Sequence, residues 1–167
     1  QLDEPGAAVL RRLIEDSHRR VVTGVRCEEI RGDGHVRAVR LSNGEVIPAD
    51  FLVVSAGVRP RLSLAESAGL ACARGALVNE RLETSDPDIY AVGDVSEFRG
   101  SVWAIIPAAL AQARVAAAQI VGQETVFDGI VPSTTLKVTG IDLMSIGDVN
   151  PDGKGYQEVR SSHPEQG

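Results

Sequence analysis

The sequence is short of basic residues and of cysteine, and it has no long hydrophobic run. Lys and Arg number 17 against 23 Asp and Glu, which leaves a net charge of −6. Surfaces that bind nucleic acid normally carry a basic excess, so we expect no nucleic acid partner. No apolar run approaches the roughly 18 residues that span a bilayer, so no membrane association is predicted. The two cysteines, Cys27 and Cys72, lie far apart and indicate neither a disulfide scaffold nor a zinc site.

Several functional signatures are also missing. No charged segment followed by an apolar leader opens the sequence, which favours a cytoplasmic protein. The three histidines show no metal-ligand spacing, so no metal site is predicted. No Gly-x-Ser-x-Gly nucleophile elbow occurs, and no Gly-x-Gly-x-x-Gly phosphate loop occurs either.

The composition is nevertheless that of a globular protein, with 43% hydrophobic and 24% charged residues. Apolar spacing and the positions of Pro and Gly predict helices over 4–17, 64–68 and 107–121. They predict strands over 21–25, 36–41, 45–47, 76–79, 136–138 and 143–146, with Asn43-Gly44 closing a hairpin. Two continuously apolar stretches, 51–54 and 89–92, have the pattern of buried parallel strands.

Residues 83–94 join a Thr-Ser pair, a turn around Pro87, an apolar stretch and a final Gly-Asp, and a helix is predicted to follow. This order places the carboxylate of Asp94 at the carboxyl end of a strand, the edge of an open α/β sheet where ligands bind. Gly93 lets a bulky group approach the backbone, and Asp94 can accept hydrogen bonds from hydroxyls of a sugar or a sugar alcohol. A turn without a ligand is the alternative interpretation.

The stretch resembles the second flavin-binding motif of FAD-dependent pyridine nucleotide-disulfide oxidoreductases. The resemblance implies that Asp94 binds a ribitol hydroxyl of FAD, with Gly93 and Val95 beside it. Thr84 and Gly57 are further cofactor-binding candidates on the same ground. The later segment 136–148 resembles the subgroup of nitrite reductase large subunits and rubredoxin-reductase-like enzymes.

The resemblance covers roughly residues 1–150 and implies an α/β fold class. We expect partial FAD/NAD(P)-binding Rossmann-like domains with an antiparallel β-hairpin unit. Residues 1–72 would form the C-terminal part of the NAD(P)-binding domain, and 73–131 the second part of the FAD-binding domain. Residues 132–167 would begin a C-terminal domain.

The start of the helix predicted over 107–121 is a second candidate contact with the cofactor. A helix N-terminus carries partial positive charge and free N–H groups. In the family, a helix at this position points at N1 and the C2 carbonyl of the flavin, so Ile106, Pro107 and Ala108 would favour the reduced form. Packing of this alanine-rich helix on a sheet is the alternative. For three other residues the sequence allows two roles, either a place near the cofactor or an ordinary structural one: Arg59, Trp103 and Lys137.

Taken with the missing glycine loops, these features predict a fragment of an FAD-dependent NAD(P)H oxidoreductase. The parent protein would pass hydride from NAD(P)H to the flavin and electrons on to an acceptor; the isolated piece would be inactive. No catalytic residue is identified, and the acceptor stays open between nitrite reductase partners, rubredoxin, ferredoxin, oxygen and disulfides. A non-catalytic binding or dimerisation module, or an unrelated α/β domain, are the alternatives. Open sheet edges lead us to expect a homo-oligomer.

Overall fold

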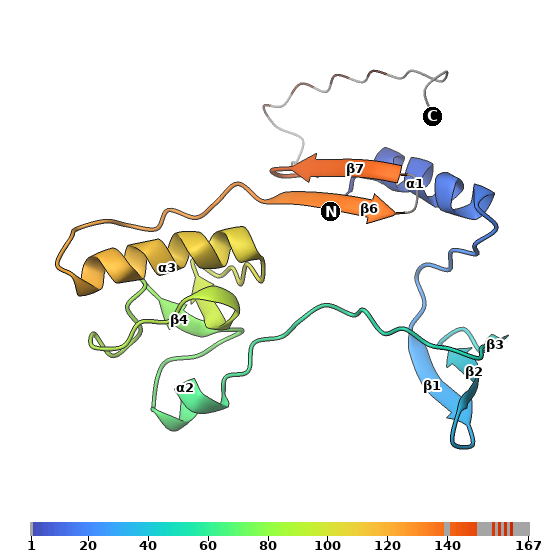
Figure 1. The fold of residues 1–167 in the computed structure, drawn as a ribbon, viewed down its shortest axis with the longest axis horizontal. Coiled ribbons are helices and arrows are strands. Elements are labelled where there is room, and N and C mark those ends of the chain that lie inside the picture. Colours follow the sequence, from blue (N-terminus) through green and yellow to red (C-terminus); the bar gives the residue numbers. More distant parts are fainter. Residues whose placement is uncertain are drawn as a thin grey trace. The chain divides into compact units, whose positions relative to one another are not determined.

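The computed structural model describes residues 2–138 and 141–149 and the single residues 155, 157, 159 and 161, arranged in two units (Figure 1). The first unit comprises residues 1–52 and 131–167, and the second comprises residues 53–130. The first unit contains α1 (Glu4–Asp16), β1 (Cys27–Gly32), β2 (Val36–Leu41), β3 (Val46–Pro48), β6 (Ser133–Val138) and β7 (Ile141–Ile146). The second contains α2 (Ser63–Ser67), β4 (Ala76–Val78), η1 (Gly93–Val95), β5 (Ser96–Phe98) and α3 (Ile106–Ile120).

The predicted first helix and hairpin are confirmed. α1 begins where the Asp3 carboxylate accepts a hydrogen bond from the backbone N–H of Gly6 at 2.9 Å, and Pro5 lies in the first turn. β1, β2 and β3 form an antiparallel sheet in that order. Asn43 and Gly44 form the turn between β2 and β3, where the φ of +87° at Gly44 is a left-handed conformation that favours glycine.

The last two predicted strands are confirmed and are longer than expected. β6 and β7 pair antiparallel, with Leu136 opposite Leu143. The sequence did not decide the role of Lys137, and its side chain lies outside the described part of the chain. Most residues after position 149 lie outside it as well.

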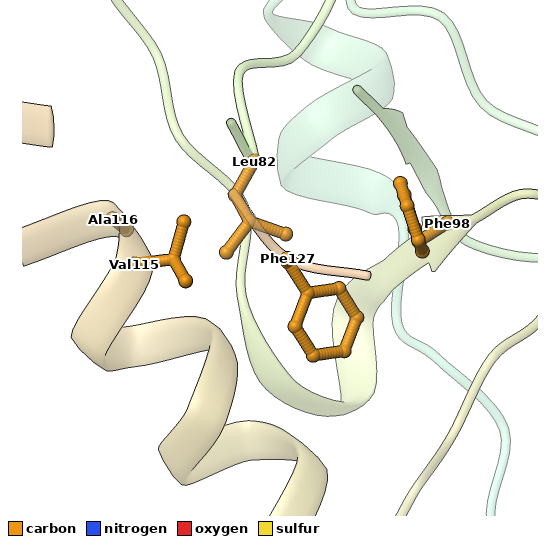
Figure 2. Close-up of a cluster of buried hydrophobic side chains, with 5 residues drawn as sticks. All are labelled: Leu82, Phe98, Val115, Ala116 and Phe127. Carbon is orange, nitrogen blue, oxygen red and sulfur yellow. The ribbon is translucent and has the colours of Figure 1, made fainter. Parts of the chain in front are cut away.

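The core of the second unit lies against one face of α3 (Figure 2). The buried positions of this helix recur at helical spacing, and Pro107 lies in its first turn, as predicted. Opposite the helix, the rings of Phe98 and Phe127 meet edge to face with centroids 5.2 Å apart. Leu82 is fully buried among them although its φ is +65°. The cluster consists of Leu82, Phe98, Val115, Ala116 and Phe127.

β5 is a short buried strand that the sequence did not predict. It pairs in parallel with β4, with Ala76 opposite Ser96. The strand begins with Ser96 and Glu97, two polar residues that do not suggest a buried strand. Glu97 is nevertheless buried, and its Oε2 accepts a hydrogen bond from the N–H of Gly75 at 2.8 Å. A Cβ on Gly75 would lie 2.9 Å from the Cβ of Glu97, so the close approach of the two segments requires glycine. The buried carboxylate therefore belongs to the pairing of β4 with β5.

Three of the predicted strands are wrong. Residues 21–25 and 51–54 form no strand, and 89–92 contributes only an isolated bridge between Tyr90 and Glu83. Phe51, Val53 and Val54 are 81%, 71% and 74% exposed, although buried positions were predicted. A strand needs a neighbour that exchanges backbone hydrogen bonds with it, and among the described residues no strand pairs with these segments. The apolar composition of these segments suggested burial, but it did not provide a neighbouring strand to pair with.

Exposed ion pairs link β1 and β2. Glu29 Oε2 accepts hydrogen bonds from Nε and Nη2 of Arg31, both at 3.0 Å, and from Nε of Arg40 at 2.9 Å. Arg40 Nη1 also donates to Glu28 Oε2 at 2.6 Å. The hydrogen bonds from Arg31 and then from Arg40 lower the pKa of Glu29 below its ordinary value.

We therefore expect acid to weaken the hairpin. A carboxylate whose pKa is lowered by folding stabilises the fold above its ordinary pKa of about 4.3. That contribution is lost as the pH falls through the lowered pKa. Arg40→Gln should raise the pKa of Glu29 towards its ordinary value in an NMR titration of the carboxyl carbon. Arg11→Gln, which breaks the pair with Glu15 on α1, is the matched control and should not change it. A Glu29 titration that is the same with and without Arg40 would contradict the expectation.

Candidate functional site

Thr84 builds the turn that precedes the Gly-Asp pair. Its hydroxyl donates to the carbonyl oxygen of Asp86 at 2.9 Å and accepts from the N–H of the same residue at 3.1 Å. The N–H of Thr84 donates to the carbonyl of Ile89, which closes the turn. The structure therefore uses the Thr84 hydroxyl inside its own turn.

Gly93, Asp94 and Val95 form the single turn η1 directly before β5. Gly93 has a φ of +77°, a backbone conformation that a non-glycine residue adopts only with strain. The carboxylate of Asp94 is exposed, and it makes no hydrogen bond with another described residue. It is therefore free to accept hydrogen bonds from hydroxyl groups.

The start of α3 packs against η1, and a Cβ on Gly93 would lie 3.6 Å from the Cβ of Ala109. In the part of the chain that the structure describes, no side chain caps this end of the helix, and no acidic residue lies in its first turn. Pro107 has no N–H, so the first-turn donors are the N–H groups of Ile106 and Ala108. The side chains of Ile106 and Pro107 are exposed, whereas Ala108 is buried. The structure thus brings the predicted residues of η1 and of the helix start together.

Gln112 joins η1 to α3, a role that the sequence did not predict. It is fully buried, and its Oε1 accepts hydrogen bonds from the N–H of Gly93 at 2.6 Å and from the hydroxyl of Ser96 at 3.1 Å. The Ser96 hydroxyl also lies 2.9 Å from the carbonyl oxygen of Gly93. The signal was present in the sequence, because Gln112 interrupts the apolar stripe formed by Ala108, Val115 and Ala116.

Gly57 lies in an irregular segment of the second unit and has a φ of +79°. Apart from its two chain neighbours, no described residue has an atom within 4 Å of the position that its Cβ would take. The next residues line a pocket of about 520 Å³. Its walls are Val58, Arg59, Pro60, Arg74, Val102 and Ala104. For Trp103 the sequence allowed either a place near the cofactor or a structural role. Its side chain packs against the buried cluster, which supports the structural role.

Within the described residues, no three His, Cys, Asp or Glu side chains gather as a metal site would require. Neither does any helix in that part of the chain combine the length and hydrophobicity of a membrane span.

Residues 1–119 match the family model described as pyridine nucleotide-disulphide oxidoreductase, which is more than half of the chain. The chain belongs to this oxidoreductase family. Residues 132–167 match a second model, the rubredoxin NAD+ reductase C-terminal domain. Membership confirms the resemblance, the α/β fold class with its antiparallel hairpins, and FAD and NAD(P)H as the cofactors of the family.

The similarity extends to individual members of the oxidoreductase family. The chain is 37% identical to the nitrite reductase (NADH) large subunit of Escherichia coli over 93% of its own length and 19% of the relative's. It is 34% identical to the NADH-rubredoxin oxidoreductase of Clostridium acetobutylicum over 99% of its own length and 40% of the relative's. A solved structure of an FAD-dependent pyridine nucleotide-disulphide oxidoreductase from Desulfovibrio vulgaris is 31% identical, with a TM-score of 0.72 over 82% of this chain and 36% of that one. The chain therefore spans less than half of each of these relatives.

Proposed function

We propose that this chain is the part of an FAD-dependent NAD(P)H oxidoreductase that holds the ribitol and the pyrimidine edge of the flavin. In this proposal residues 1–72 complete the NAD(P)-binding domain, 73–131 supply the second part of the FAD-binding domain, and 132–167 begin a C-terminal domain. FAD, when bound, supplies the acceptance of hydride and the onward transfer of electrons. The residues of the chain bind and orient it.

The observation that carries the proposal is the pairing of an exposed carboxylate with an uncapped helix start. Asp94 can accept hydrogen bonds from ribitol hydroxyls, and the backbone of Gly93 leaves room for a bulky neighbour. The N–H of Ala108, at the positive end of α3, would favour the negative charge of a reduced flavin. The acceptor and donor chemistry of these residues thus fits the ribitol and the pyrimidine edge of the flavin that they would contact.

A second candidate function is a non-catalytic binding or dimerisation module. Exposed apolar side chains favour it, since Phe51, Val53 and Val54 would otherwise meet water in the isolated chain. Under the first proposal the same side chains pack against other parts of the full protein. Under the first proposal the electrons also pass to a redox acceptor, which is rubredoxin, another protein or a small molecule, whereas the second candidate has no acceptor.

Gel filtration with absorbance detection tests the proposal. The full protein should elute with the visible absorption of oxidised flavin, and NAD(P)H should bleach that absorption. The 167-residue chain, mixed with FAD and run in parallel, should turn over no NAD(P)H, since it carries no glycine-rich phosphate loop. A full protein that elutes without flavin, leaves added FAD free and elutes as a dimer would favour the second candidate.

A further inference from the structure

The hydrogen bonds of Gln112 fix the orientation of its amide. The backbone N–H of Gly93 can only donate, so the Gln112 atom that faces it at 2.6 Å must be the oxygen. The hydroxyl of Ser96, itself fully buried, lies 3.1 Å from the same oxygen. This hydroxyl has a single proton, which the Gln112 oxygen shares with the carbonyl oxygen of Gly93 at 2.9 Å. The bond from the N–H of Gly93 is therefore the one that ties α3 to the turn that carries Asp94.

The other half of the amide bears no such bond. Gln112 Nε2 is buried and has no hydrogen-bond partner among the described residues. Burying an amide N–H₂ without a partner costs stability, and a methionine could fill a similar space without that cost. Packing alone therefore does not explain a glutamine at this position, whereas the hydrogen bond from the N–H of Gly93 to its oxygen does.

We infer that Gln112 is a positioning residue, which sets the place of Asp94 relative to the start of α3 by holding the N–H of Gly93 and the hydroxyl of Ser96. The inference rests on the proposed function, because the groups that it aligns are the two proposed contacts with FAD. Gln112 is fully buried and acts through Asp94. Loss of its oxygen should therefore loosen the turn, and FAD binding should weaken only as far as Asp94 contributes to it.

A double-mutant cycle in the full protein tests this role, with the dissociation constant of FAD measured by fluorescence titration. Gln112→Met should raise the Kd about fivefold, the effect of losing one ordinary hydrogen bond. The double variant with Asp94→Ala should bind no more weakly than Asp94→Ala alone, because a residue that acts through another gives no additive effect. Gln112→Glu keeps an oxygen acceptor, and burial favours its neutral, protonated form, so it should bind FAD more tightly than Gln112→Met.

Two further measurements separate positioning from a general loss of structure. Hydrogen–deuterium exchange of the apoprotein should show faster exchange over residues 93–96 in Gln112→Met, and unchanged exchange over 76–78. Gln119→Met is the matched control, because Gln119 lies on the same helix but donates to the carbonyl of Thr125; its FAD affinity should match the wild type. If Gln112→Met does not fold, Ser96→Ala removes the second of the two donors and should shift both readouts in the same direction.

The outcomes distinguish this inference from the proposed function. If Asp94→Ala weakens FAD binding but Gln112→Met does not, or if their effects add, the positioning role is overturned and the Asp94 assignment stands. If Asp94→Ala leaves the FAD affinity unchanged, the Asp94 assignment and the inference both fail, and the N–H groups at the start of α3 are left as the candidate contact.

Discussion

Replacing Leu82 with alanine should destabilise the second unit by about 2–5 kcal/mol, the range found for buried Leu→Ala changes. Leu82 is fully buried and lies in the cluster with Phe98 and Phe127 (Figure 2). The N–H of Phe127 donates to the carbonyl of Glu80 at 2.7 Å, which ties the segment after α3 to the turn that carries Leu82. A cavity at this point would therefore loosen the contact between the turn and α3.

The backbone of Leu82 supplies a sharper comparison. Its φ of +65° costs a non-glycine residue roughly 1–2 kcal/mol relative to the right-handed region. Leu82→Gly removes one more carbon than Leu82→Ala but relieves this strain, so the glycine variant should be at least as stable as the alanine variant. If the glycine variant were clearly less stable than the alanine variant, the backbone of Leu82 would not be strained as we expect.

Urea unfolding followed by the fluorescence of Trp103 measures both variants, because this is the single tryptophan of the chain and it packs against the cluster. Leu64→Ala is the control, since Leu64 is 81% exposed on α2 and its loss should change the free energy of unfolding by less than about 0.5 kcal/mol. A Leu82→Ala variant as stable as the Leu64→Ala variant would show that Leu82 does not belong to the core.

The elements that sequence predicted well are those with local signals. Asp3 with Pro5 marks the start of α1, Asn43-Gly44 closes the hairpin, and Pro107 marks the start of α3. Each signal acts within a few residues, through a cap, a left-handed φ or a missing N–H. These signals do not depend on which distant segment packs nearby, so the structure reproduces them.

The failures depend on distant partners. Residues 51–54 read as a buried strand, but hydrophobicity alone does not provide the neighbour that a strand needs. β5 was missed for the opposite reason, because Glu97 looks like a surface residue until Gly75 supplies its hydrogen bond. Gln112 is a similar case: its place in an apolar stripe could be read from the sequence, whereas its contact with Gly93 could not. The candidate site was therefore predictable at Gly93 and Asp94 but not in the contact that holds them.

Replacing Asp94 with alanine should weaken FAD binding by the full protein about 10- to 100-fold, measured as the Kd in a fluorescence titration. A hydrogen bond to a charged group contributes about 1.5–3 kcal/mol, which corresponds to this change in affinity. Because the Asp94 carboxylate makes no hydrogen bond with other described residues, its removal should leave the unfolding of the apoprotein unchanged. The loss should therefore appear in affinity and not in stability.

Two variants isolate the role of the carboxylate. Asp88→Ala removes the same charge from the exposed turn just before this site, so it should leave the Kd of FAD unchanged if Asp94 acts by contact and not by general electrostatics. Asp94→Asn keeps an oxygen that accepts hydrogen bonds but loses the charge, and it should fall between the wild type and Asp94→Ala. Equal losses in Asp88→Ala and Asp94→Ala would point to net charge as the cause. An unchanged Kd in Asp94→Ala would remove the carboxylate from the site and leave the N–H groups at the start of α3 as its remaining candidate contact.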